Sequence, residues 1–204
     1  MSDPAGEGPL LVATRSAHKL AEIRRILPGI PLESLAEAGI PPDPVEDELE
    51  GRPTFIGNAV AKARHFVERT GRRVVADDSG LRVDALGGRP GVRTKRLALD
   101  EGVETGAGVD DANNRTLLRL LRDVPGGERG AYYVCATVLA GPGGETRASL
   151  GTCRGSIAWE PSGAGGFGFD PLFLLEDGRT MAELSDAEKD ARSHRGRAFR
   201  ALLG

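Results

Sequence analysis

Short apolar runs that alternate with amphipathic segments constrain the fold of this chain most strongly. Leu10–Ala13 has the character of a buried strand, and residues 18–27 then follow a helical spacing that ends at Pro28. A longer helix is predicted over residues 54–70, with Thr54 as its N-cap, and an apolar strand follows at residues 73–76. This alternation of strands and helices predicts an α/β fold.

The second half of the chain adds a β-meander, so the predicted sheet is mixed. Further strands are predicted over residues 131–139, 147–150, 155–159 and 171–174. Further helices are predicted over residues 113–121, from the capping box at Ser185 onward, and over residues 196–203. The proline-rich and acidic residues 41–53 are predicted to form a loop. No linker separates two folding units, so residues 1–204 are expected to form a single domain.

Composition and charge exclude several classes of protein. The net charge is −3, so no overall basic field attracts nucleic acid, and we expect no nucleic-acid partner. No apolar stretch approaches the length of a membrane span, and the first residues lack a basic leader. The two cysteines, Cys135 and Cys153, have no metal-binding spacing and are expected to be reduced. These features predict a cytoplasmic protein without a membrane partner.

Asp77-Asp78-Ser79-Gly80 is the first candidate for chemistry, because it follows the apolar strand predicted at residues 73–76. Carboxylates at strand ends of α/β proteins project into the ligand crevice. Two adjacent carboxylates repel each other unless a cation neutralises them, and Mg²⁺ prefers such oxygen ligands. The same four residues also suit an ordinary turn. The run by itself leaves both interpretations open.

Several charged residues near the predicted helix starts are candidates for binding phosphate or metal. The polar turn at Thr14-Arg15-Ser16 precedes a helix N-terminus, where free backbone N–H groups bind phosphate well. Asn58 and Lys62 are an i, i+4 pair, so both side chains can point into one site. Lys19 and Lys62 could equally be solvated lysines. The acidic residues 46–50 could be a solvated loop, or one of them could reach a metal.

Two segments in the last third of the chain are candidates for binding a planar ligand. Glycines flank Phe167 and Phe169 in residues 165–170, which would let the backbone approach a ring that stacks on an aromatic side chain. A glycine-rich hairpin with two core phenylalanines is the alternative. His194 and Arg195, joined by Lys189, could donate hydrogen bonds to the carbonyl oxygens of a base. Each could instead be a structural residue.

The order of these segments resembles the inosine triphosphate pyrophosphatase family, the Ham1-type pyrophosphatases of non-canonical purine nucleoside triphosphates. The matching segments span residues 11–199 and read LVATRSAHKLAEI, TFIGNAVAKAR, VVADDSGLRVDALGGRPGV, EPSGAGGFGFDPLF and AELSDAEKDARSHRGRAF. The resemblance implies an elongated mixed β-sheet with flanking helices, in one domain of two lobes around a nucleotide cleft. It also implies a homodimer. The implied reaction is Mg²⁺-dependent cleavage of ITP, dITP or XTP to the monophosphate and pyrophosphate, which cleanses the nucleotide pool.

The resemblance also implies roles for residues of this chain. Asp78 would be the catalytic base and a metal ligand, with Glu50 and Asp77 completing the metal site. Lys62 and Ser79 would bind the substrate together with the phosphate-binding turn, which comprises Thr14, Arg15, Ser16, Ala17, His18 and Lys19. The base would be bound by Phe167, Gly168, Phe169, Asp170, Lys189, His194 and Arg195.

This sequence departs from the family pattern at four places. The usual Thr-Gly-Asn is Thr14-Arg15-Ser16, and the glutamate that often precedes Asn-Ala is Gly57. The usual Ser-Ala-Arg is Thr94-Lys95-Arg96, and the usual tyrosine of the aromatic motif is Phe169. Glu48 is an alternative to Glu50 at the metal. Two other functions stay open: the same cleavage of other modified nucleotides, with a Maf-like specificity, and a catalytically inactive nucleotide-binding paralogue.

Overall fold

The computed structural model describes residues 8–106 and 108–204, which divide into two compact units. The first unit comprises Met1–Asp78, Cys135–Gly151 and Ser193–Gly204, and the second comprises Ser79–Val134 and Thr152–Arg192. Residues 1–7, where the sequence predicts no leader, lie outside the described part of the chain. The prediction that residues 1–204 form one two-lobed domain stays a prediction.

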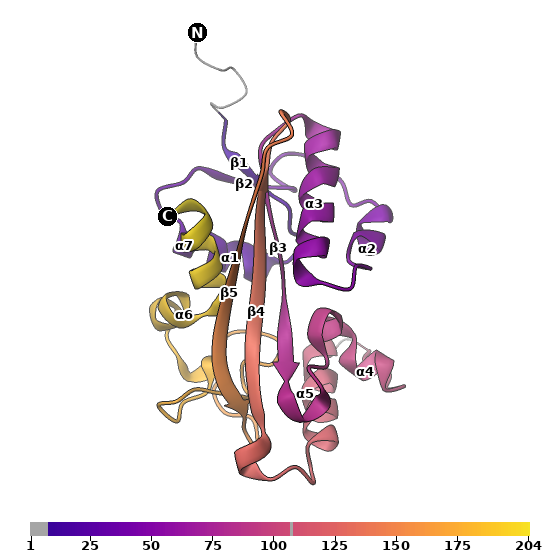
Figure 1. The fold of residues 1–204 in the computed structure, drawn as a ribbon, viewed down its shortest axis with the longest axis vertical. Coiled ribbons are helices and arrows are strands. Elements are labelled where there is room, and N and C mark those ends of the chain that lie inside the picture. Colours follow the sequence, from indigo (N-terminus) through magenta and orange to yellow (C-terminus); the bar gives the residue numbers. More distant parts are fainter. Residues whose placement is uncertain (1–7, 107) are drawn as a thin grey trace. The chain divides into compact units, whose positions relative to one another are not determined.

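A mixed sheet forms the centre of the fold, as the sequence predicts. Among the described residues it has six strands in the order β2-β1-β3-β4-β5-β6 (Figure 1). The strands are β1 (Leu10–Val12), β2 (Leu32–Ser34), β3 (Val74–Val83), β4 (Gly130–Ala140), β5 (Thr146–Ile157) and β6 (Phe173–Leu174). Strand β1 pairs in parallel with β2 and β3, whereas β5 pairs antiparallel with β6. Parallel and antiparallel pairing in one sheet confirms the predicted mixed α/β architecture.

Helices flank this sheet. They are α1 (Ala17–Ile26), α2 (Val45–Leu49), α3 (Phe55–Thr70), α4 (Leu97–Asp100), α5 (Val109–Leu120), α6 (Asp186–Arg192) and α7 (His194–Leu203). Short 3-10 turns occur at Asp84–Leu86, Gly91–Arg96, Gly126–Glu128 and Met181–Glu183. The predicted caps are present: the Thr54 side chain accepts a hydrogen bond from Gly57 N, and Gly71 ends α3 with φ of 65°. Side-chain caps and a left-handed glycine are why α3 begins and ends there.

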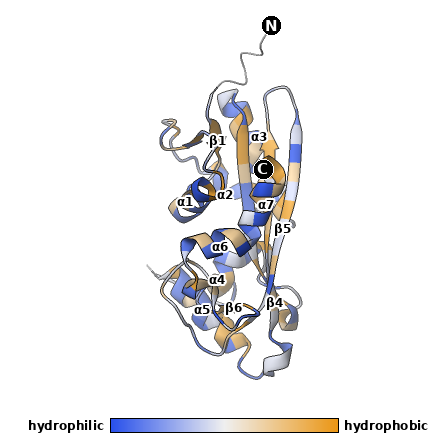
Figure 2. Ribbon diagram, turned by 90° about the vertical axis from the view of Figure 1, so that its left-hand side faces the viewer, coloured by the Kyte–Doolittle hydropathy of each residue, from blue (hydrophilic) through white to orange (hydrophobic). Residues whose placement is uncertain are grey.

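Each unit has its own apolar core. In the first unit, β1 is buried along its whole length, and Ile23 of α1 and Phe199 of α7 pack in the same cluster. Figure 2 shows α1 mainly in hydrophilic colours, so only part of its surface serves this core. A Cβ on Gly151 of β5 would lie 2.1 Å from the carbonyl oxygen of His194, so glycine lets α7 approach the strand closely. The second unit packs around Leu81, Leu117, Leu121, Cys153, Leu172 and Phe173.

Two predictions of local structure near the acidic residues are wrong. Residues 41–53 are not only loop, because α2 forms within them. Its first turn carries Glu46, Asp47 and Glu48, whose negative charges favour a helix N-terminus. The predicted turn at Asp77–Gly80 is also absent, because β3 continues through these residues to Val83. The acidic pair therefore lies inside a strand and not at its end.

Other elements differ from the prediction in extent or orientation. Strand β2 was not predicted, and β6 is shorter than the strand predicted over residues 171–174. The helical spacing of Ile56, Ala59 and Ala63 predicts an inward apolar face for α3. Ala59 and Ala63 are buried, but Ile56 is 39% exposed, and Asn58 and Lys62 are buried in its place. Hydrophobic spacing misjudges part of this face, since polar residues with partners occupy it.

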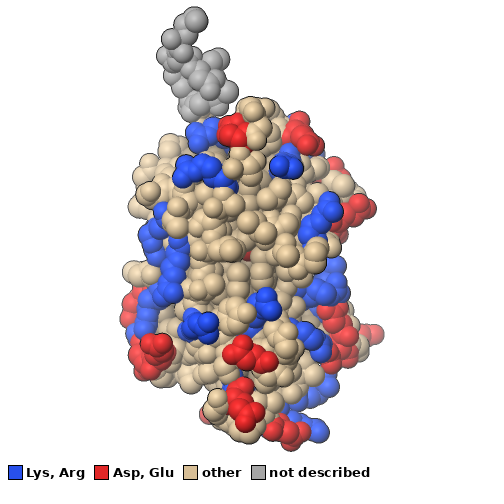
Figure 3. Space-filling model, in the orientation of Figure 1, with Lys and Arg blue, Asp and Glu red and all other residues tan. Residues whose placement is uncertain are grey.

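Charges of both signs occur on the surface. On the face drawn in Figure 3, Lys and Arg intermingle with Asp and Glu around the margin, and uncharged residues fill much of the middle. Among the described residues, no helix has both the length and the apolar character needed to cross a membrane.

Candidate functional site

Strand β3 presents the acidic pair to two different sets of partners. Successive side chains of a strand point to opposite faces of its sheet. Asp77 accordingly meets α1 and α7 through Lys19 and Arg195, whereas Asp78 meets α3 through Asn58. Both carboxylates are buried, with Asp77 2% and Asp78 6% exposed. All five residues belong to the first unit.

Asp77 is an ion-paired carboxylate. Its Oδ2 lies 3.0 Å from Lys19 Nζ and accepts hydrogen bonds from Nε and Nη2 of Arg195, each at 3.4 Å. Arg195 Nη1 also donates to Glu22. Burial would raise the pKa of Asp77, but the charges of Lys19 and Arg195 outweigh it and lower that pKa well below its usual range. Asp77 is therefore a fixed negative charge, and its Oδ1 has no hydrogen-bond partner among the described residues.

Asp78 is a less neutralised carboxylate. Its Oδ2 accepts a hydrogen bond of 2.8 Å from Asn58 Nδ2, and its Oδ1 lies 3.9 Å from Lys62 Nζ. Burial raises the pKa of Asp78 above the ordinary 3.8, although Lys62 and Lys19 oppose the shift. A carboxylate with a raised pKa is a stronger proton acceptor than a freely solvated one, which suits a general base.

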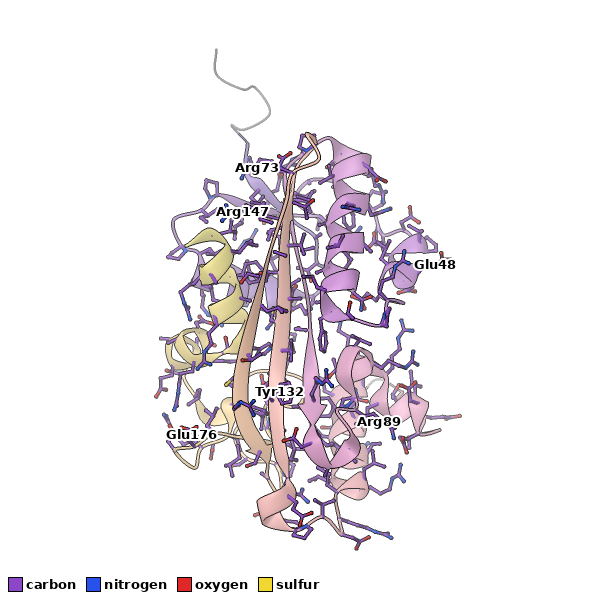
Figure 4. All side chains as sticks on the ribbon, viewed as in Figure 1. Glu48, Arg73, Arg89, Tyr132, Arg147 and Glu176 are labelled. Carbon is purple, nitrogen blue, oxygen red and sulfur yellow. The ribbon has the colours of Figure 1, made fainter. Side chains whose placement is uncertain are left out.

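Glu50 completes a pair of carboxylates around Lys62. Glu50 Oε1 lies 3.0 Å from Lys62 Nζ, the same ammonium that approaches Asp78. Two carboxylates that share one cation offer hard oxygen ligands at one place, and Mg²⁺ is commonly held by one or two carboxylates plus phosphate oxygens. These donors fit Mg²⁺, although no group of three His, Cys, Asp or Glu that could hold a metal occurs among the described residues. Glu48, labelled in Figure 4, is exposed on α2.

The predicted phosphate-binding turn lies at the N-terminus of α1, as the sequence indicates. The side chain of Ser16 caps this helix by accepting a hydrogen bond from Lys19 N. Ala17 and His18 occupy the exposed first turn, and Thr14 is half-buried. The Arg15 side chain binds Glu46 and does not join the Asp77 cluster.

Some of the predicted base-binding residues form a second cluster, in the second unit. Asp170 is buried, and its Oδ2 accepts hydrogen bonds from Lys189 Nζ at 2.6 Å and from Phe167 N at 2.9 Å. Its Oδ1 accepts from the hydroxyl of Tyr133 at 3.1 Å. The Lys189 ammonium lies 4.8 Å from the centre of the Phe167 ring, within cation–π distance. The structure thus brings three of the predicted residues together and adds Tyr133.

Helix α5 anchors the loop that carries this cluster. Asp110 Oδ2 accepts a hydrogen bond of 2.7 Å from Gly168 N, and Asn114 Nδ2 donates to Gly168 O at 2.9 Å. Gly166 has φ of 71°, and a Cβ there would lie 2.2 Å from Asp170 Oδ2, so the loop requires glycine at this position. No local pattern points to Asp110, Asn114 or Tyr133, because each contacts a partner distant in the chain.

His194 and Arg195 do not belong to the same unit of the chain as Lys189. Both begin α7 after the N-cap Ser193, and they belong to the first unit, whereas Lys189 belongs to the second. Arg195 is 2% exposed, and its guanidinium is engaged by Asp77 and Glu22. Ser79 follows Asp78 in β3 and is half-buried, and Phe169 is buried in the apolar core of the second unit.

The mixed sheet, its buried acidic pair and the cations around that pair define an α/β protein with an enzyme-like acidic site. The Ham1 family model matches residues 10–204. The dITP/XTP pyrophosphatase of Nocardia farcinica is 48% identical over 196 residues, which are 95% of this chain and 92% of that protein. The chain belongs to the Ham1 family, which confirms the resemblance found in the sequence.

Solved structures agree with this assignment. The Staphylococcus aureus Ham1 protein has a TM-score of 0.79 at 33% identity and covers 95% of each chain. The nucleoside-triphosphatase, or dITP/XTP pyrophosphatase, of Mycobacterium abscessus has a TM-score of 0.71 at 45% identity over 96% of this chain and 99% of that one. These similarities confirm the predicted fold class.

Proposed function

We propose that this chain hydrolyses non-canonical purine nucleoside triphosphates, such as dITP, XTP and ITP, to the monophosphate and pyrophosphate. The relatives named dITP/XTP pyrophosphatase and the match to the Ham1 family support the proposed substrates. The observation that carries the reaction is the buried Asp78, whose pKa is raised and which shares Lys62 with Glu50. This arrangement supplies a base beside a place for a cation.

The reaction is a displacement at the α-phosphorus by water. Asp78 accepts a proton from the water, whose oxygen forms a bond to the α-phosphorus. The bond between that phosphorus and the oxygen bridging to the β-phosphate breaks, and pyrophosphate leaves with the bonding electrons. Asn58 holds Asp78 Oδ2, which leaves Oδ1 to face the water.

Glu50 and Asp78 would hold Mg²⁺, with water and phosphate oxygens as its other ligands. When bound, Mg²⁺ would neutralise charge on the phosphate oxygens during the displacement. Lys62 would add a positive charge at the same place, and burial of its side chain would strengthen this interaction. The Asp77 carboxylate would support the site by fixing Lys19 and Arg195.

The remaining predicted residues would bind the rest of the substrate. The N-terminus of α1 would bind the triphosphate through backbone N–H groups. A 6-oxo base accepts hydrogen bonds where adenine presents an amino group, so buried donors would reject adenine strongly. The roles rest on the following residues: Thr14, Ser16, Ala17, His18 and Lys19 for phosphate, Ser79 beside it, and Phe167, Gly168, Phe169, Asp170, Lys189, His194 and Arg195 for the base. A homodimer, a cytoplasmic location and the lack of a nucleic-acid partner remain predictions.

A substrate panel tests the proposal directly. Release of pyrophosphate would be measured from dITP, XTP, ITP, dUTP, dGTP and dATP, each with Mg²⁺ and with a chelator. We expect turnover of the first three with Mg²⁺ only. A preference for dUTP or another pyrimidine would favour the Maf-like specificity instead, and binding without turnover of any nucleotide would favour an inactive paralogue.

A further inference from the structure

The segment that carries Glu50 is held in place without a buried side chain. None of residues 40–50, all of which are described, is buried. Helix α2 has only five residues, and its N-cap, Pro44, makes no side-chain capping bond. A helix this short is unstable by itself, and apolar burial does not fix this one. Polar contacts must therefore set the position of Glu50.

Arg15 makes the short side-chain contacts at the start of this segment, whereas Arg69 of α3 adds longer ones, of 3.5 Å, to Asp43 and to Pro41 O. Its Nε and Nη2 donate to the two oxygens of Glu46, at 2.9 Å and 2.7 Å, in a bidentate pair. Its Nη1 donates to Ile40 O at 2.8 Å, and Nη2 also donates to Pro41 O at 2.9 Å. A bidentate arginine–carboxylate pair fixes geometry more strictly than a single ion pair does. One guanidinium thus holds both the residues that precede α2 and the first turn of this helix.

Because Glu46 and Glu50 lie at the two ends of α2, fixing Glu46 also fixes the position of Glu50. The two glutamates are four residues apart, about one helical turn, so their side chains leave α2 on the same side. Lys62 of α3 contacts Glu50 at that end, and α2 lies beside α3 (Figure 1). Arg15 and Lys62 therefore hold the two ends of one short helix.

We infer that Arg15 is a positioning residue that fixes Glu50 for metal binding through Glu46 and α2. This inference rests on the proposed function, because it takes Glu50 as a ligand of Mg²⁺. It also links two parts of the site, since Arg15 lies within the turn that would bind the triphosphate. Direct binding of phosphate by Arg15 is the competing role. A guanidinium has five N–H donors, and these four hydrogen bonds use four of them, so a single N–H is left for a phosphate oxygen.

Two measurements on the nucleotide-free protein test the inference. Arg15→Gln, Glu46→Gln and the double variant would be compared with the wild type by hydrogen–deuterium exchange and by Mn²⁺ binding, followed by electron paramagnetic resonance. Each single variant should speed exchange in residues 43–50 and weaken Mn²⁺ binding about 10-fold, the lower range for partners that orient metal ligands. The double variant should bind Mn²⁺ no more weakly than Arg15→Gln alone, because that single variant already removes the contact with Glu46.

Arg24→Gln is the matched control. Arg24 forms an exposed ion pair with Glu37 in the same unit and lies outside the proposed site. Its substitution should leave both readouts at the wild-type values. If Arg15→Gln does not fold, Glu46→Gln still carries the test, because it removes the charge while keeping the shape of the side chain.

Unchanged exchange in residues 43–50, or unchanged Mn²⁺ affinity, would overturn the inference. So would a higher KM for dITP in Arg15→Gln but not in Glu46→Gln, since that result assigns Arg15 to phosphate. A separate result would disprove the proposed function: no release of pyrophosphate from dITP by the wild type. The exchange measurement does not depend on that result.

Discussion

Asp77 and Asp78 are neighbours in β3, yet their carboxylates enter differently built surroundings on opposite faces of the strand. On the Asp77 face, Lys19 and Arg195 converge on one buried carboxylate and lower its pKa. On the Asp78 face, one amide and a lysine 3.9 Å away leave burial as the larger influence, and the pKa is raised. The pKa values of two identical side chains are thus shifted in opposite directions.

This difference gives the two carboxylates separate tasks. A carboxylate saturated by cations cannot readily accept a proton, but it organises those cations. A carboxylate whose charged form is disfavoured by burial contributes little to stability, but it is poised to accept a proton. The Asp77 face should therefore support structure, and the Asp78 face should support chemistry.

Asp78→Asn should have the largest effect of these variants, and it should lower turnover without lowering stability. Removing the general base should lower kcat for dITP about 10²- to 10⁴-fold, the range for general-base catalysis. The midpoint of urea unfolding should not fall, because the variant removes a buried charge that the folded state disfavours. Steady-state kinetics and urea unfolding of the same preparation measure both. A variant with wild-type kcat would disprove the proposed role of Asp78.

Asp77→Asn should act mainly on stability. The change removes the charge of the carboxylate that lies 3.0 Å from the buried Lys19 and 3.4 Å from the buried Arg195. Breaking a buried ion pair in this way costs about 3–5 kcal/mol of unfolding free energy. Urea unfolding at pH 7 would measure the loss. A loss of about 1 kcal/mol or less, as for an exposed pair, would contradict the assignment of Asp77 as a structural carboxylate.

The pH dependence of stability should distinguish the two faces further. Because the pKa of Asp77 is lowered in the folded protein, its contribution is present above the unfolded carboxyl pKa of about 3.8 and is lost as pH falls below it. The difference in unfolding free energy between wild type and Asp77→Asn should therefore shrink between pH 5 and pH 3. For Asp78 the raised pKa gives the opposite sign, so acidification removes a destabilising charge. A difference that stays constant with pH would be inconsistent with a charged Asp77.

Asn58→Ala should have the smallest effect. The Asn58 side chain is fully buried, donates to Asp78 and accepts from Arg52 N, both at 2.8 Å. Each hydrogen bond contributes about 0.5–1.5 kcal/mol, so thermal or urea unfolding should detect a modest loss. Turnover should fall less than in Asp78→Asn, because the base remains. A fall in kcat as large as that of Asp78→Asn would move Asn58 into the chemistry itself.

Much of the fold could be predicted from local signals. Thr54 and Gly71 mark the ends of α3, and the capping box at Ser185 and Glu188 starts α6, because caps act within a few residues. The run through Asp77 to Val83 was misjudged, because Asp and Gly favour turns locally while neighbouring strands hold β3 extended. Helix α2 was missed for a similar reason: its support comes from Arg15, 31 residues away from Glu46 in the sequence.

The sequence predicts which residues form the candidate site better than it predicts which of them contact one another. The i, i+4 spacing of Asn58 and Lys62 predicts that both side chains can point into one site, and in the structure both approach Asp78, since helical geometry is local. Arg195 is predicted to donate hydrogen bonds to a base. In the structure its guanidinium binds Asp77 and Glu22, which are 118 and 173 residues away along the sequence. No local pattern encodes pairings across such separations.

The amino-acid sequence by itself determined most of the strands and helices, the caps and the motifs that identify the Ham1 family. These features depend on neighbouring residues, and a chain carries them before it folds. Only the tertiary structure decided that Asp77 lies 3.0 Å from Lys19, and that the more distant Lys62, 3.9 Å from Asp78, is shared with Glu50. Such differences arise from which faces meet and which charges become buried together, and burial and distance set the strength of charge interactions.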